Sequence, residues 1–197
     1  GFWKDGVPTK KDPPLTLGHE ISGTVEKAGA AYEHLEGRDV IVPAVIPCGD
    51  CPLCRAGRGN ACRAQLMPGN DMDGGFAEWI VVPGRGLCEV TETGGYELAD
   101  LCVIADAVTT PYQAVRRSGL AGGELAVVVG VGGVGGYCTQ IAAALGARVI
   151  AIDVDPARLH MIEAHGAAAT IDASAVDFRA LRDLSLIHIS EPTRLRR

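Results

Sequence analysis

The chain has 197 residues, 47% of them hydrophobic and 21% charged, and its formal net charge is −6. This composition is typical of a folded globular protein, and the acidic balance argues against a nucleic-acid surface, which needs clustered Lys and Arg. No apolar run reaches the roughly 18 residues that a membrane helix requires and no signal peptide opens the chain, so we expect a cytoplasmic protein without membrane or nucleic-acid partners.

The first part of the chain, residues 1–116, reads as short β-segments separated by glycine and proline turns. Strands are expected at residues 21–25, 39–42 and 76–82. Residues 40–47 are apolar but contain two prolines, so they cannot form one regular central strand. Many short strands with irregular loops indicate a barrel-like β-domain.

The second part, residues 117–183, alternates between apolar strands and helices. Apolar runs predict buried parallel strands at 125–129, 148–152 and 168–171, and the segments between them predict helices at 134–145 and 156–165. Gly146 and Gly166 stand where helices commonly end. This βαβαβ order predicts half of a doubly wound Rossmann sheet, without its second half.

Both ends of the chain depart from these patterns. Residues 184–197 resemble the translation of a sequencing adapter, and we expect them to be a non-native tail. The alternative is a genuine basic helical tail. The chain also opens at Gly1 without an initiator methionine, so we expect a fragment of a longer protein.

A glycine-rich loop joins the first expected strand of the second part to its helix. Gly130, Gly132 and Gly135 match G-x-G-x-x-G, and the next strand ends in an acid, Asp153. The first glycine permits the tight turn, the second the approach of a pyrophosphate, and the third close packing of helix on strand. The expected cofactor-binding residues are Gly130, Gly132, Gly133, Val134, Gly135 and Asp153. A glycine-rich turn without a ligand is the alternative.

Asp153 bears on the choice of dinucleotide. Its carboxylate is expected to accept hydrogen bonds from the adenosine ribose hydroxyls. A 2′-phosphate at that position would meet the negative charges of Asp153 and Asp155, so NAD is favoured over NADP. The alternative role for Asp153 is a simple cap at the end of the strand.

Four of the seven cysteines lie within fifteen positions of one another. Their spacing, C-x2-C-x2-C-x7-C across residues 48–62, can close a tetrahedral site, as structural zinc requires. The expected zinc ligands are Cys48, Cys51, Cys54 and Cys62. An iron–sulfur cluster and unmetallated thiols are the alternatives. The other cysteines, Cys88, Cys102 and Cys138, lie in apolar contexts typical of core residues.

These motifs, together with Gly18-His19-Glu20 before them, occur in the order found in zinc-dependent medium-chain alcohol dehydrogenases, which the chain resembles over residues 1–183. The resemblance implies a mixed fold, with a GroES-like β-barrel domain followed by a truncated Rossmann domain. Residues 17–23, 42–48, 67–71, 74–77 and 105–112 further resemble members that oxidise a cyclic hydroxyacyl-CoA with NAD. A small-molecule alcohol or hydroxyacyl-CoA substrate is therefore implied.

The resemblance also implies a catalytic zinc with three protein ligands, the first of which would precede this chain. His19 corresponds to the second ligand, and Glu20 beside it to a residue that supports the zinc ligands or binds the zinc transiently. Asp106 corresponds to the third ligand, where most members have a cysteine. Thr110 corresponds to a residue at the nicotinamide and Arg158 to one at the adenosine ribose. Three of these residues also have alternative roles. His19 could be a core histidine, Asp106 a helix cap, and Arg158 part of a solvated helix face.

Three functions are compatible with these features. The first is NAD-dependent oxidation of a cyclic hydroxyacyl-CoA by a homo-oligomeric parent enzyme, with the fragment itself expected to be inactive. The second is a zinc dehydrogenase of simple secondary alcohols or polyols. The third is a non-catalytic NAD-binding zinc protein, against which His19 and Glu20 argue, because a purely structural protein needs no spare metal ligand beside an acid.

Overall fold

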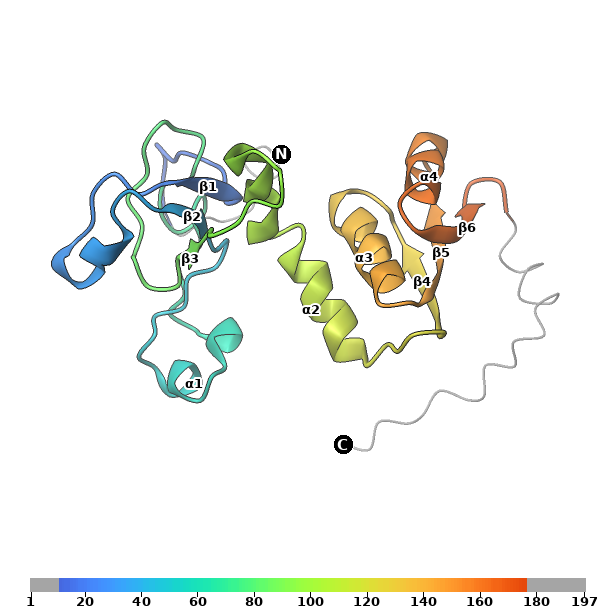
Figure 1. Ribbon diagram of the computed structural model, residues 1–197, viewed down its shortest axis with the longest axis horizontal. Helices are drawn as coiled ribbons and strands as arrows, with labels where there is room; N and C mark the ends of the chain where they lie inside the picture. The colour runs from blue at the N-terminus through green and yellow to red at the C-terminus, as the bar shows by residue number, and fades with distance from the viewer. Residues whose placement is uncertain (1–10, 177–197) are drawn as a thin grey trace. The chain divides into compact units, whose positions relative to one another are not determined.

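The computed structural model describes residues 11–176, and the chain separates into two compact units between Thr109 and Thr110 (Figure 1). Each unit is described by itself. The expected boundary after residue 116 lies toward the far end of helix α2 (Thr109–Ser118), which opens at the division between the units. The expectations for the start of the chain and for residues 184–197 lie outside the described residues.

The first unit contains a three-stranded antiparallel sheet, in the order β1 (Ile21–Thr24), β2 (Asp39–Val42) and β3 (Cys88–Glu89). Ile21 pairs with Val42 at one end of the β1–β2 ladder. The strands expected at 21–25 and 39–42 are therefore confirmed. β2 ends directly before Pro43, which cannot donate a ladder hydrogen bond. The helical turns of this unit are η1 (Ala30–Leu35), α1 (Pro52–Arg55), η2 (Gly59–Ala61) and η3 (Leu98–Ala105).

The strand expected at residues 76–82 is wrong, because no ladder pairs this segment within the described residues. Its apolar alternation is nevertheless present: Ile80 and Val82 pack against the small core of the unit, while Trp79 and Val81 are exposed. Alternating burial requires only that one face meets a core. A strand also requires a neighbour for its backbone groups, and the sequence pattern does not report that neighbour.

The second unit carries a parallel sheet, in the order β4 (Leu125–Val129), β5 (Arg148–Asp153) and β6 (Ala167–Asp172). Helix α3 (Gly133–Ala144) connects β4 to β5, and helix α4 (Pro156–Glu163) connects β5 to β6 (Figure 1). The predicted βαβαβ order and parallel pairing are confirmed, with bounds within two residues of those expected. The expected burial of β4 is wrong, because Leu125, Val127 and Val129 are exposed in the described residues.

The local sequence explains where these elements begin and end. Gly146 and Gly166 follow α3 and α4 with φ angles of +85° and +110°, a conformation that glycine adopts without a Cβ penalty. Pro156 opens α4, and the Asp155 carboxylate caps it by accepting the backbone N–H of Ala157 at 2.9 Å. The core beneath consists of one face of the sheet and the inner faces of both helices, including Val128, Val149, Ala151, Leu159 and Ile162. No helix within residues 11–176 is long and apolar enough to cross a membrane.

Candidate metal centre and dinucleotide loop

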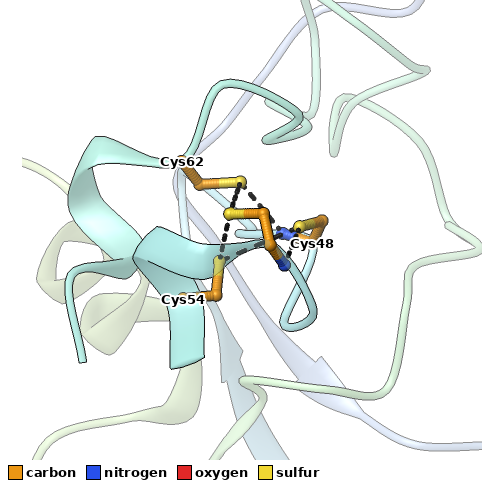
Figure 2. A group of neighbouring side chains, drawn as sticks. Cys48, Cys54 and Cys62 are labelled. Carbon is orange, nitrogen blue, oxygen red and sulfur yellow. Dashed lines mark hydrogen bonds between the residues drawn. The ribbon is translucent and has the colours of Figure 1, made fainter. Parts of the chain in front are cut away.

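The four predicted zinc ligands converge in space. Their sulfur atoms all lie within 4.8 Å of one another, with Cys51 at 3.4 Å from Cys54 and at 3.9 Å from Cys62, and Cys48 at 3.8 Å from Cys54 (Figure 2). A tetrahedral zinc with bonds of about 2.3 Å separates its sulfurs by about 3.8 Å. The donor set and its spacing therefore fit zinc.

Backbone N–H groups support two of these sulfurs. Cys51 donates its N–H to Cys48 Sγ, and Cys48 donates its own to Cys62 Sγ, both at 3.4 Å. Hydrogen bonds from the backbone of Asp50 and of Cys51 lower the pKa of the Cys48 thiol to about 6, whereas burial raises the pKa of Cys54 to about 12. Four thiols held this close cannot all ionise without a cation between them. The cysteine lobe is therefore suited to bind a metal cation.

A second pair of potential ligands joins residues 87 positions apart. His19 Nε2 lies 3.2 Å from Asp106 Oδ2, and both side chains are partly buried. Glu20 Oε1 instead accepts the backbone N–H of Ala107 at 2.9 Å, so its carboxylate holds the residue next to Asp106. Within residues 11–176, the four cysteines are the only group of three or more potential ligands found this close together. His19 and Asp106 thus supply two donor atoms.

Thr110 lies in the first turn of α2 and is exposed. The preceding residue, Thr109, returns its hydroxyl to the carbonyl oxygen of Ala105 at 3.1 Å. Only the family resemblance implies that Thr110 lies at the nicotinamide, and this assignment stays a prediction.

The glycine loop has the geometry that the motif predicts. Gly130 has a φ of +82° and donates its N–H to Ile152 O at 2.7 Å, which holds the loop beside β5. A Cβ on Gly135 would stand only 1.7 Å from Gly130 O, so only glycine fits where α3 crosses the turn. Gly132 is the N-cap of α3 and offers no side chain to its first N–H groups. Such a helix end attracts phosphate through its N–H groups and its dipole.

Asp153 is buried at the end of β5, with 7% of its surface exposed. Its carboxylate accepts backbone N–H groups from Val131 at 2.7 Å, Val154 at 2.8 Å and Asp155 at 3.0 Å. These bonds, that of Val131 foremost, hold the pKa of Asp153 below its usual value. The bond to Val131 ties the strand end to the glycine loop. Sequence reasoning missed it, because nothing in a spacing of 22 residues identifies a backbone donor.

Arg158 extends from α4 toward both acids. Its guanidinium lies 3.9 Å from Asp153 Oδ2 and 3.4 Å from Asp155 Oδ2, and a Cβ on Gly132 would lie 3.7 Å from it. Arg158 is half exposed. The structure therefore brings together the glycine loop and Asp153, which the motif assigns to the dinucleotide, and Arg158, which only the family resemblance assigns to it.

Known proteins resemble this chain over most of its described length. The model of the alcohol dehydrogenase GroES-like domain matches residues 2–92. L-galactonate-5-dehydrogenase of Escherichia coli (strain K12) is 34% identical over 168 residues, which is 85% of this chain and 48% of that protein.

Solved structures give the same result. The alcohol dehydrogenase of the archaeon Aeropyrum pernix superposes with a TM-score of 0.80 at 32% identity, covering 93% of this chain and 54% of that one. A protein of Sinorhizobium meliloti 1021, described as a zinc-binding dehydrogenase and solved with NADP, gives 0.79 at 34% identity, covering 87% and 49%. The chain spans about half the length of these relatives. The expected fold, a GroES-like domain followed by part of a Rossmann sheet, is confirmed, and the chain is similar in sequence and fold to zinc-dependent alcohol dehydrogenases over about half of their length.

Proposed function

We propose that the full-length protein containing this chain is a dehydrogenase that oxidises a secondary alcohol and transfers hydride to NAD. One observation carries the proposal: His19 Nε2 and Asp106 Oδ2 converge to 3.2 Å. Two ligands of a tetrahedral zinc with bonds of about 2.0–2.1 Å lie about 3.3 Å apart, so the pair fits two corners of such a site. A non-catalytic NAD-binding protein stabilised by the cysteine lobe has no use for this second pair.

Each residue has a separate task in this proposal. His19 and Asp106 hold the catalytic metal, while the four cysteines hold a structural zinc. A bound catalytic zinc supplies a Lewis acid that lowers the pKa of the substrate alcohol. Glu20 keeps Ala107 in place through its N–H, which orients the neighbouring Asp106.

The proposed nicotinamide cofactor is NAD. The N-terminus of α3, with Gly132, Gly133 and Val134, would receive the pyrophosphate. The lowered pKa of Asp153 keeps it ionised at neutral pH, and with Asp155 it opposes a 2′-phosphate. The single charge of Arg158 already faces these two carboxylates. We assign Arg158 to the adenosine ribose and Thr110 to the nicotinamide, as the family resemblance implies.

For the substrate we propose 6-hydroxycyclohex-1-ene-1-carbonyl-CoA, a cyclic hydroxyacyl thioester of anaerobic benzoyl-CoA degradation. The support is the resemblance of residues 17–23, 42–48, 67–71, 74–77 and 105–112 to the dehydrogenase of that thioester. A dehydrogenase of simple secondary alcohols or polyols is the second candidate, and the similarity to an L-galactonate dehydrogenase favours it. We further propose a cytoplasmic, homo-oligomeric enzyme.

The test follows NADH formation by the full-length protein. It compares 6-hydroxycyclohex-1-ene-1-carbonyl-CoA with simple secondary alcohols, polyols and L-threonine, each with NAD and with NADP. Turnover of the thioester alone supports the narrow substrate. Turnover of simple alcohols or polyols alone keeps the dehydrogenase and refutes the thioester, and inactivity on every substrate refutes the enzyme.

A further inference from the structure

The segment that leads into His19 is held by a loop more than fifty residues away. Three consecutive carbonyl oxygens, at residues 16–18, accept hydrogen bonds from the backbone N–H groups of residues 74–76. The pairs are Gly74 with Thr16 at 2.8 Å, Gly75 with Gly18 at 2.9 Å, and Phe76 with Leu17 at 2.9 Å. The last of these carbonyls belongs to the residue directly before His19. We call residues 69–76 the clasp.

The clasp approaches so closely that glycine is required. A Cβ on Gly74 would stand 2.1 Å from Gly18 O, and a Cβ on Gly69 would stand 2.8 Å from Gly18 N. Both neighbours are backbone atoms, which cannot rotate aside as a side chain can. Because close carbon–oxygen contacts stop at about 3.3 Å, one methyl group on Gly74 would push Gly18 away by roughly 1 Å.

Two aspartates brace the clasp. Asp71 Oδ2 accepts the N–H of Met67 at 2.9 Å, which closes the turn at the start of the loop. Asp73 Oδ1 accepts the N–H of Thr16 at 2.9 Å, and its other oxygen pairs with Lys11. The bond from Lys11, followed by that from Thr16, lowers the pKa of Asp73. Asp71 and Asp73 carry no chemistry of their own in the sequence patterns. Here Asp73 ties the loop to Thr16, while Asp71 closes the turn that leads into the loop.

We propose that the clasp is a positioning element for His19, which sets the distance between His19 Nε2 and Asp106 Oδ2. Asp106 is held by its own local turn, in which Val108 donates its N–H to Val103 O and Thr109 donates its hydroxyl to Ala105 O, both at 3.1 Å. A shift of Gly18 therefore moves His19 relative to Asp106. This inference rests on the proposed catalytic role of the pair. Misplacing a catalytic group by about 1 Å costs about 100-fold in rate.

The test compares Gly74→Ala with Gly23→Ala in the full-length protein. Gly23 lies in β1, four residues after His19, and a Cβ there meets no atom within 4 Å, so it is a matched control. Three quantities are measured: the crystal structure, the zinc content, and kcat with KM for the alcohol. We expect Gly74→Ala to displace His19 by about 1 Å, to lose the catalytic zinc while keeping the cysteine-bound zinc, and to lower kcat about 100-fold. Gly23→Ala retains the wild-type position, zinc content and kcat.

Two outcomes overturn the inference: His19 unmoved in the structure of Gly74→Ala, or unchanged kcat together with a full zinc content. If the wild type itself binds only the cysteine-held zinc, the proposed function fails, but the displacement of His19 still decides the role of the clasp. If Gly74→Ala does not fold, Gly69→Ala replaces it. There the Cβ would stand 2.8 Å from Gly18 N, a backbone atom that cannot rotate aside, so a smaller shift of His19 is expected and an unmoved His19 refutes the clasp.

Discussion

Gly135→Ala is expected to destabilise the second unit and to weaken NADH binding. A Cβ at this position would stand 1.7 Å from Gly130 O, whereas close carbon–oxygen contacts stop at about 3.3 Å, so α3 and the glycine loop must separate by about 1.6 Å. Overpacking of this kind costs about 1–3 kcal/mol, and a backbone neighbour argues for the upper end. At about 2–4 °C per kcal/mol for a domain of 150–250 residues, the melting temperature should fall by roughly 6–12 °C.

The assay is thermal unfolding of the full-length protein together with NADH titration by fluorescence. Gly136→Ala is the control, because Gly136 is the next residue of the same helix and the nearest atom to a Cβ there, Val131 O, lies at an ordinary contact distance of 3.6 Å. Alanine is also the better helix former, so the control should melt at or slightly above the wild-type temperature. Equal melting temperatures and equal NADH affinities for the two variants would refute the packing argument.

Three further predictions concern the other sites. Cys54→Ser should remove the zinc held by the cysteine lobe and the exposed Cys88→Ser should not, as elemental analysis would reveal; equal zinc contents contradict the four-thiolate site. The folded-state pKa of Asp153 is lowered, so its stabilisation is present above about pH 4 and is lost as the pH falls through that pKa. The free energy of unfolding, measured with urea at a series of pH values, should then fall more steeply with decreasing pH for the wild type than for Asp153→Asn. Parallel pH dependences of the two proteins would contradict this prediction. Asp106→Ala should lower kcat for NADH formation at least about 100-fold. The control Asp12→Ala, at an exposed position, should leave kcat unchanged. An active Asp106→Ala variant would rule out a metal held by His19 and Asp106.

Much of the second unit could be predicted because its signals are local. Apolar runs define β4 and β5, and glycines end the helices between the strands. The spacing of the four cysteines likewise predicts one site, because the short segment that carries them keeps their sulfur atoms close together. In each case the interacting residues are close in sequence, so the chain itself enforces the contact.

The long-range contacts required the tertiary structure. The convergence of His19 with Asp106 was anticipated only through the family resemblance, since 87 residues separate them. The sequence did not predict the hydrogen bond from the clasp to the Gly18 carbonyl, nor the bond from Val131 to Asp153. Both use backbone N–H groups, which every residue except proline carries, so the sequence does not distinguish the donor.

The unpaired segment 76–82 illustrates the same limit. Its alternating pattern correctly reports which side chains face the core, but a β-ladder depends on a partner strand that the pattern does not name. By itself, the sequence determined the elements of the second unit, the candidate ligands and the dinucleotide motif. The tertiary structure decided how closely the distant backbone segments meet and which atoms face one another, because those contacts depend on folding between segments that are far apart in the chain.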